Sequence, residues 1–375
     1  MDARRAGRAL RNRARRFAHP APRLDRFAPR SLLTLPEHHV PAAAVPAVDV
    51  HNHLGRWLTR DGSWMAPDVG RLLADLDACN IATVVNLDGR WSAELEANLD
   101  RYDRAHPERF ATFCHVDWEL LRRPDADERL AASLRASVDA GARGLKVWKD
   151  LGLDVTDAGG RRVLPDDPRL DGLWETAGEL GVPVLIHVAD PLAFFLPMDR
   201  HNERLEELRR FPGSSRAALG PEGRARLLES LETVVGRHPR TQWVAAHAAG
   251  CTEDLAWVSG LLAAHPNLVV DVAARVGELG RQPRATRRLV TDHPDQVLFG
   301  TDVFPFRAEE VRIYFRLAET EDEYFPYSTG EVPHAGRWTI SGLGLEPELL
   351  EKLYAGNARR VLSGQPAGSP SRTER

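Results

Sequence analysis

The stretch AVDVHNH at residues 47–53 decides how the rest of the chain is interpreted, because a short apolar run ends there in a pair of histidines. Further along the chain, single polar residues stand in the same position at the ends of other apolar runs. They are Lys146, His187, His247 and Asp302. Imidazole and carboxylate groups are ligands that zinc and its neighbours in the transition series accept. The sequence therefore predicts a metal site built from the ends of several strands.

The apolar runs predict eight strands, and stretches with helical spacing alternate with them. Several runs are continuously apolar, as in strands buried on both faces. The predicted strands are Ala47–His51, Ala82–Leu87, Ala111–Val116, Gly144–Trp148, Val182–Val188, Gln242–His247, Leu268–Val272 and Gln296–Thr301. The predicted helices include Pro67–Cys79, Asp125–Ala140, Pro168–Leu180, Pro221–Gly236, Thr252–Ala264 and Pro347–Leu362.

Eight strand-helix repeats favour an α/β fold of the (β/α)8 TIM-barrel type, in which function lies at the carboxyl ends of the strands. A doubly wound open sheet is the alternative, although its usual glycine-rich first turn is absent. Two connections are long, at residues 189–221 and 303–344. Long connections at this end of a barrel are expected to cap the active site.

The totals suit one large soluble domain. The chain has 375 residues, of which 43% are apolar, and a formal net charge of -4. No run approaches the roughly 18 apolar residues of a membrane helix, so no membrane span is expected. The three cysteines are far apart and form no CxxC pair, which favours reduced, buried thiols and a cytoplasmic location. They are Cys79, Cys114 and Cys251.

The two ends of the chain differ from the body in composition. Residues 1–45 are predicted to be a basic, partly disordered extension, residues 46–362 a single catalytic barrel, and residues 363–375 a disordered tail. The first 30 residues hold ten arginines, and no apolar segment of a signal peptide follows them. A disordered extension or a start codon placed too early explains this composition better than a nucleic-acid-binding arm, so nucleic acid is not expected as a partner.

The motif DVHNH at residues 49–53 resembles the opening motif of the amidohydrolase superfamily. His187, His247 and Asp302 follow in the order and strand positions that the superfamily has. The stretch YAGNARRV at residues 354–361 is similar to the last helix of the amidohydrolase-2 family, which includes aminocarboxymuconate-semialdehyde decarboxylase. The resemblance implies a metal-dependent enzyme with a small-molecule substrate, and a homodimer would be in keeping with the superfamily.

The resemblance also suggests roles for these residues. His51, His53, His187 and Asp302 are the expected metal ligands, holding one ion rather than two, with Zn²⁺ preferred and Mn²⁺ as the alternative. Asp302, His247 and Lys146 are the expected catalytic residues. The implied reaction is hydrolysis of an ester, lactone or amide by a metal-activated water. The alternatives are non-oxidative decarboxylation of a small unsaturated or aromatic acid, and a barrel that binds without catalysis.

Four side chains have more than one interpretation. Lys146 could form a carbamate bridge between two metals, contact substrate, pair with Asp302 or face outward, because lysine is rarely buried unpaired. Arg275 is predicted to hold a substrate carboxylate, with a surface ion pair to Glu278 as the alternative. Trp57 and Trp148 are predicted to bind substrate, with packing of the long loops as the alternative.

Overall fold

The computed structural model describes residues 23 and 31–364 of the chain, and it contains the eight predicted strands in the predicted order. They are β1 (Ala47–Asn52), β2 (Ile81–Asn86), β3 (Phe110–Thr112), β4 (Leu145–Val147), β5 (Val184–Ile186), β6 (Trp243–Ala245), β7 (Leu268–Asp271) and β8 (Val297–Leu298). Most end earlier than predicted. The residues after them leave the hydrogen-bonded ladder and turn toward the mouth of the barrel.

The strands are parallel and form a closed ring. Pairing runs from β1 to β3 and from β4 to β8, and backbone hydrogen bonds join the two groups at both seams. At the first seam, Lys146 N donates to Cys114 O (2.7 Å) and Cys114 N to Gly144 O (2.8 Å). At the second, Asp302 N donates to His51 O (2.8 Å) and Val50 N to Phe299 O (3.1 Å). The predicted (β/α)8 barrel is confirmed, and an open doubly wound sheet is excluded.

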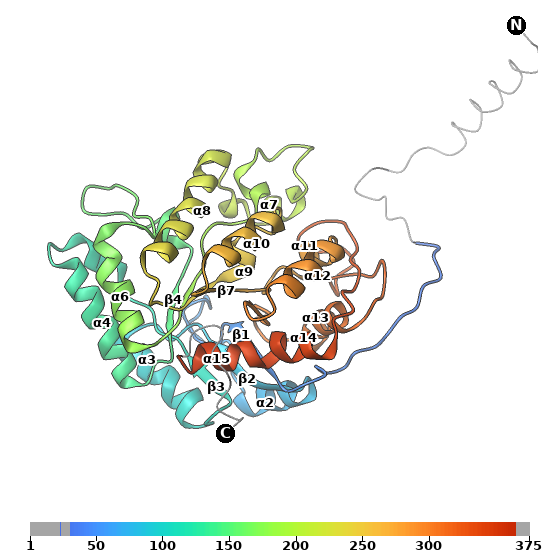
Figure 1. Cartoon of the computed structure of the whole chain (residues 1–375), viewed down its shortest axis with the longest axis horizontal. Coiled ribbons are helices and arrows are strands. Elements are labelled where there is room, and N and C mark those ends of the chain that lie inside the picture. Colours follow the sequence, from blue (N-terminus) through green and yellow to red (C-terminus); the bar gives the residue numbers. More distant parts are fainter. Residues whose placement is uncertain (1–22, 24–30, 365–375) are drawn as a thin grey trace, which may run out of the picture. The chain divides into compact units, whose positions relative to one another are not determined.

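Helices surround the strands, as Figure 1 shows. The helices are α2 (Val69–Ala78), α3 (Ser92–Leu99), α4 (Ala126–Ala140), α5 (Asp150–Leu153), α6 (Asp171–Leu180), α7 (Leu205–Arg210), α8 (Gly220–Arg237), α9 (Ala246–Ala249), α10 (Leu255–Ala264), α11 (Val276–Gly280), α12 (Pro283–Asp292), α13 (Ala308–Glu319), α14 (Pro347–Glu351) and α15 (Asn357–Leu362). Shorter helical turns lie at Asp100–Arg104, Trp118–Arg122, Pro168–Leu170, Leu192–Phe195, Pro212–Ser214 and Lys352–Gly356.

The predicted helices are present with small changes at their ends. The predicted helix Pro347–Leu362 consists of α14 and α15 joined without a break by a π-helical turn. The predicted long connection at residues 303–344 contains an additional helix, α13. None of the helices in residues 31–364 is long and apolar enough to cross a membrane.

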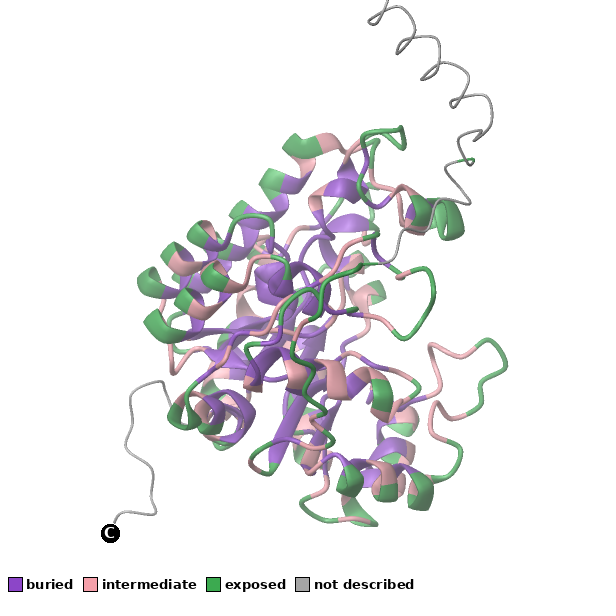
Figure 2. Cartoon of the chain, turned by 90° about the vertical axis from the view of Figure 1, so that its right-hand side faces the viewer, coloured by how far each residue is buried: buried purple, intermediate pink, exposed green. Residues whose placement is uncertain are grey.

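The core forms two layers on either side of the strands. Inside the barrel, Val48 and Val50 of β1 pack with Val85, Val244 and other side chains from the strands. Outside it, a larger apolar cluster lies between the strands and the helices. Figure 2 shows buried residues concentrated in the middle of the barrel and exposed ones on the outer faces of its helices. All three cysteines are free and buried, as predicted.

The chain divides into the units Met1–Pro36 and Glu37–Arg375. In the second unit, the residues before β1 are hydrogen-bonded to the barrel: Ala43 N donates to Cys79 O (3.1 Å) and His38 N to Asp322 Oδ2 (2.8 Å). Most of the predicted basic extension and disordered tail lies outside the described residues. The predicted domain limits therefore stay a prediction.

Candidate metal centre

The two histidines of the opening motif point their Nε2 atoms into the mouth of the barrel because carboxylates hold their other nitrogens. His51 Nδ1 lies 2.8 Å from Asp271 Oδ2, and His53 Nδ1 lies 2.6 Å from Asp88 Oδ1. A carboxylate accepts but does not donate, so each Nδ1 carries the proton and each Nε2 presents a lone pair. All four side chains are buried.

Asp302 lies opposite these lone pairs. Its Oδ1 is 3.5 Å from His53 Nε2 and 3.9 Å from His51 Nε2, and its Oδ2 is 4.0 Å from His247 Nε2. The residue has a φ of 57°, a left-handed conformation that is strained outside glycine. Burial raises the pKa of Asp302, although the nearby His53 and Lys146 lower it in part. The geometry leaves this carboxylate facing three imidazoles.

His247 reaches the site through an unusual turn. β6 ends at Ala245, not at His247 as predicted, and residues 247–249 all have φ between 53° and 60°. Left-handed conformations cost non-glycine residues roughly 1–2 kcal/mol each, so the surrounding structure must hold this turn. Asp271 does so in part, because its Oδ1 accepts a hydrogen bond from His247 N (2.8 Å). His247 Nδ1 lies 2.8 Å from Ala273 O, which leaves Nε2 free to face Asp302.

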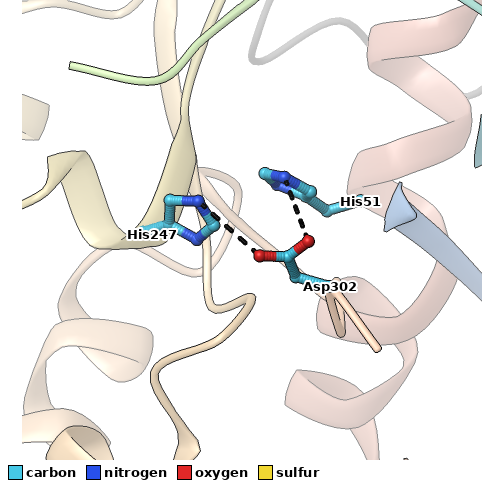
Figure 3. Close-up of side chains that lie close together, drawn as sticks. All are labelled: His51, His247 and Asp302. Carbon is cyan, nitrogen blue, oxygen red and sulfur yellow. Dashed lines mark ion pairs between the residues drawn. The ribbon is translucent and has the colours of Figure 1, made fainter. Parts of the chain in front are cut away.

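These groups fit a metal ion. His51, His247 and Asp302 each offer a ligand atom, and the three atoms lie within 4.8 Å of one another. Figure 3 shows Asp302 between the two imidazoles. His53 Nε2 and Asp302 Oδ1 are buried without a hydrogen-bond partner among the described residues. Two buried acceptor atoms facing each other are costly unless something positive lies between them, and a divalent cation meets that need.

His187 lies beside this group but is oriented differently. Its ring centroid is 4.4 Å from that of His247, while its Nε2 lies 3.2 Å from the carbonyl of Ala189. In this orientation Nε2 donates to a carbonyl, so it is not directed at Asp302. Burial lowers the pKa values of all three histidines, His51, His187 and His247, well below the ordinary value of an imidazole. Neutral imidazoles are the form that binds metals.

Lys146 does not face outward. It is 1% exposed, and its Nζ lies 3.5 Å from His51 Nε2 and 5.3 Å from the centre of the Trp148 ring. Burial lowers the pKa of Lys146 to about 8, against the pull of Asp302 and other carboxylates. Its ammonium forms no ion pair with a described carboxylate, including Asp302.

Arg275 is a second buried cation beside the site. It precedes α11 and is 7% exposed, and its Nη1 donates a hydrogen bond to the carbonyl of Ala274 (3.0 Å). The alternative of a surface pair with Glu278 is wrong, because Glu278 contacts Arg204 instead. The positive charge of Arg275 lowers the pKa values of His51, His187 and His247 and thus acts on the site. No described carboxylate forms an ion pair with it.

A cavity of about 330 Å³ opens beside Lys146, with Trp57, Trp148, Arg90 and His115 among its other lining residues. The Trp57 and Trp148 rings meet edge to face with centroids 5.2 Å apart. Arg90 lies over the Trp57 ring at 5.1 Å, and its Nη1 is 3.5 Å from His115 Nδ1. The two predicted tryptophans therefore do form a wall of a cavity, next to a guanidinium that the sequence analysis did not identify.

Two further residues of the site, Asp88 and Asp271, were not predicted from the sequence. Asp88 follows the apolar run of β2, and Asp271 ends β7. Both obey the rule that led to the other site residues, since each is a polar residue at the end of an apolar run. Burial alone would raise the pKa of Asp88, yet the charge of His53 and hydrogen bonds from His53 and Trp57 lower it overall.

Comparisons with known proteins establish the fold and the family of the chain. The Amidohydrolase family model Amidohydro_2 matches residues 48–364. Three solved structures share the fold: an uncharacterised TIM-barrel protein from Bordetella bronchiseptica, 2,6-dihydroxybenzoate decarboxylase from Rhizobium, and dihydroxybenzoic acid decarboxylase from Polaromonas sp. JS666. Their identities to this chain are 16%, 16% and 15%, and their TM-scores are 0.55, 0.53 and 0.52.

Each of the three alignments covers 85% of this chain, and they cover 98%, 99% and 97% of the three structures in the same order. No curated protein matches the sequence. At these identities the structural likeness establishes the fold alone. The family match, which spans most of the chain and includes the DVHNH motif, goes further: the chain belongs to the amidohydrolase family.

Proposed function

We propose that this protein is a metal-dependent, non-oxidative decarboxylase of a small aromatic or unsaturated carboxylic acid. The observation that carries the proposal is the pair of buried cations beside the metal centre, Lys146 and Arg275, neither of which has a carboxylate partner among the described residues. A buried charge without a partner is costly, and a substrate carboxylate would offset that cost. An uncharged ester, lactone or amide would not offset the cost of the buried charges.

The metal ligands in this proposal are His51, His53 and Asp302, with His247 or a reoriented His187 completing the set. The ion would polarise the bound substrate and stabilise the negative charge that develops as the carboxylate leaves. Mn²⁺ is preferred here to the Zn²⁺ of the sequence analysis. The reason is that the Polaromonas decarboxylase was solved with bound manganese and the inhibitor 2-nitroresorcinol, and imidazole and carboxylate ligands suit both metals.

The remaining groups hold the substrate and move the proton. Arg275, Lys146 and Arg90 would hold anionic groups, and Trp57 and Trp148 would hold a planar ring against the cavity wall. Decarboxylation breaks the bond to CO₂ and places a proton on the same carbon. Where His187 completes the metal set, His247 Nε2 would serve this transfer: it faces Asp302 at 4.0 Å, would take a proton from Asp302 or solvent and would pass it to the carbon, while a carbonyl holds Nδ1.

Hydrolysis stays the second candidate. Asp302 stands where it could take a proton from an attacking water, and the family as a whole is described as amidohydrolases. The names of the structural neighbours favour the lyase reaction instead, since two of the three are decarboxylases of dihydroxybenzoates.

The test is to load the protein with Mn²⁺ and measure CO₂ release from a panel of hydroxybenzoates and unsaturated acids, alongside hydrolysis of matched esters, lactones and amides. The proposal expects CO₂ release that is lost in Asp302→Asn. It also expects Arg275→Met to raise KM for acids. Turnover of uncharged esters or amides, with no release of CO₂ from any acid, would show that the chain is a hydrolase.

A further inference from the structure

Trp57 has two surfaces with different surroundings. Its ring lines the cavity, and its indole Nε1 donates a hydrogen bond of 2.6 Å to Asp88 Oδ1. That oxygen also accepts the bond from His53 Nδ1, likewise at 2.6 Å. A single carboxylate oxygen thus joins the wall of the cavity to a residue of the metal centre.

The other Asp88 oxygen is held as well. Oδ2 accepts from the backbone N–H of Gly55 at 3.1 Å, and a side chain at Gly55 would come within 2.5 Å of Asp88 Cβ. Asp88 is fully buried, so water cannot replace any of its donors. The carboxylate has only one orientation that accepts from His53, Gly55 and Trp57 at once. Its Oδ1, which orients His53, accepts two hydrogen bonds, and Trp57 donates one of them.

We propose that Trp57 is a positioning residue for the metal centre, acting through Asp88 to hold His53 with its Nε2 lone pair directed at Asp302. Without the indole N–H, Asp88 can rotate about its Cα–Cβ bond, and the bond to His53 Nδ1 loses its fixed direction. The inference builds on the metal centre of the proposed function, but it is independent of which bond the enzyme breaks.

Two consequences separate this role from simple packing. Substituting Trp57 with Phe keeps a ring in the wall and removes only the N–H. Loss of a partner of a metal ligand typically weakens metal binding about 10- to 100-fold, so we expect Trp57→Phe to raise the Kd for Mn²⁺ about 10-fold. Asp88→Ala removes the acceptor itself and should raise the Kd further.

Trp148 provides a matched control. Its ring also lines the cavity and lies 5.1 Å from the His53 ring, close to an edge-to-face arrangement, but its indole makes no hydrogen bond among the described residues. Trp148→Phe therefore removes an indole N–H from the same wall without touching Asp88. Its Kd for Mn²⁺ should stay within about twofold of the wild-type value, since packing changes of this size cost little.

The experiment titrates metal-free wild-type protein and the variants with Mn²⁺ and follows free Mn²⁺ by electron paramagnetic resonance. Circular dichroism confirms that each variant is folded. A double-mutant cycle completes the experiment: in the Asp88→Ala background, which has no acceptor for either donor, Trp57→Phe should have no further effect on the Kd. Equal Mn²⁺ affinity of Trp57→Phe and wild type, or the same loss in Trp148→Phe, would overturn the inference alone. Failure of the wild-type protein to bind Mn²⁺ would overturn both it and the proposed function.

Discussion

At the scale of single residues, the centre depends on which nitrogen of each histidine is held. His51, His53 and His247 all have Nδ1 bound to an oxygen, and all direct Nε2 at Asp302. The sequence could predict the histidines, because each ends an apolar run. It could not predict their orientation, because the oxygens that hold them, two of carboxylates and one of a backbone carbonyl, come from residues 26 to 220 positions away in the chain.

Lys146 offers a prediction at this scale. Replacing it with Met keeps the length of the side chain and removes a positive charge 3.5 Å from His51 Nε2. Metal binding should stay at one ion per chain and become tighter, since the repulsion is gone. By contrast, kcat/KM for acids should fall about 10- to 100-fold, the usual cost of losing a hydrogen bond to a charged group. Elemental analysis and steady-state kinetics check this, and loss of metal from the variant would instead indicate a carbamate bridge.

His115 offers a pH-dependent prediction. Burial lowers its pKa to about 4 from an ordinary value of 6.5. The unfolded chain therefore binds a proton at higher pH than the folded chain, and the stability due to neutral His115 is present above pH 6.5 and lost as the pH falls toward 4. Between pH 6.5 and 5, wild type should lose about 2 kcal/mol more free energy of unfolding than His115→Gln. Urea denaturation at both pH values measures this difference. Equal losses of free energy of unfolding in the two proteins would contradict the prediction.

At the scale of secondary-structure elements, the seam between β8 and β1 brings Asp302 to the histidine pair. Asp49 of β1 closes this seam: its carboxylate accepts from Thr301 N (2.9 Å), Thr301 Oγ1 (2.6 Å) and His51 N (3.1 Å). The order of the elements was predictable from apolar runs and helical spacing. The strand ends were not, because residues such as His247 leave the ladder in a left-handed turn that only tertiary contacts sustain.

The seam can be tested by Asp49→Ala. The substitution leaves several buried donors without an acceptor, and each such donor costs about 1–3 kcal/mol. The free energy of unfolding, measured with urea, should fall by at least about 2 kcal/mol, while Asp49→Asn, which keeps one acceptor oxygen, should lose less. A stable Asp49→Ala variant would mean that the backbone bonds alone close the ring.

At the scale of the whole molecule, the barrel unit begins before the first strand. Ala43, Ala44 and His38 make hydrogen bonds to Cys79, Glu319 and Asp322. Composition set the predicted limit at residue 45, since the arginine-rich stretch and the loop before β1 are both unlike a strand or helix. It could not show that a loop without regular structure is bound to the barrel through backbone groups.

Two truncations follow from this. The first removes residues 1–36 and keeps the whole unit that begins at Glu37. The second removes residues 1–46 and with them the hydrogen bonds of His38, Ala43 and Ala44, so its melting temperature should be about 5 °C below that of the first. Differential scanning calorimetry of the three proteins distinguishes these outcomes. Equal melting temperatures of the two truncated proteins would show that these hydrogen bonds do not stabilise the barrel.

We propose above all that His51, His53 and Asp302 form a centre for one divalent ion. The most direct measurement is the metal content of protein purified without chelator and incubated with Mn²⁺, determined by elemental mass spectrometry for wild type and Asp302→Asn. One ion per chain in wild type, lost in the variant without loss of fold, is the predicted result. Two ions per chain, or none in wild type, would contradict it.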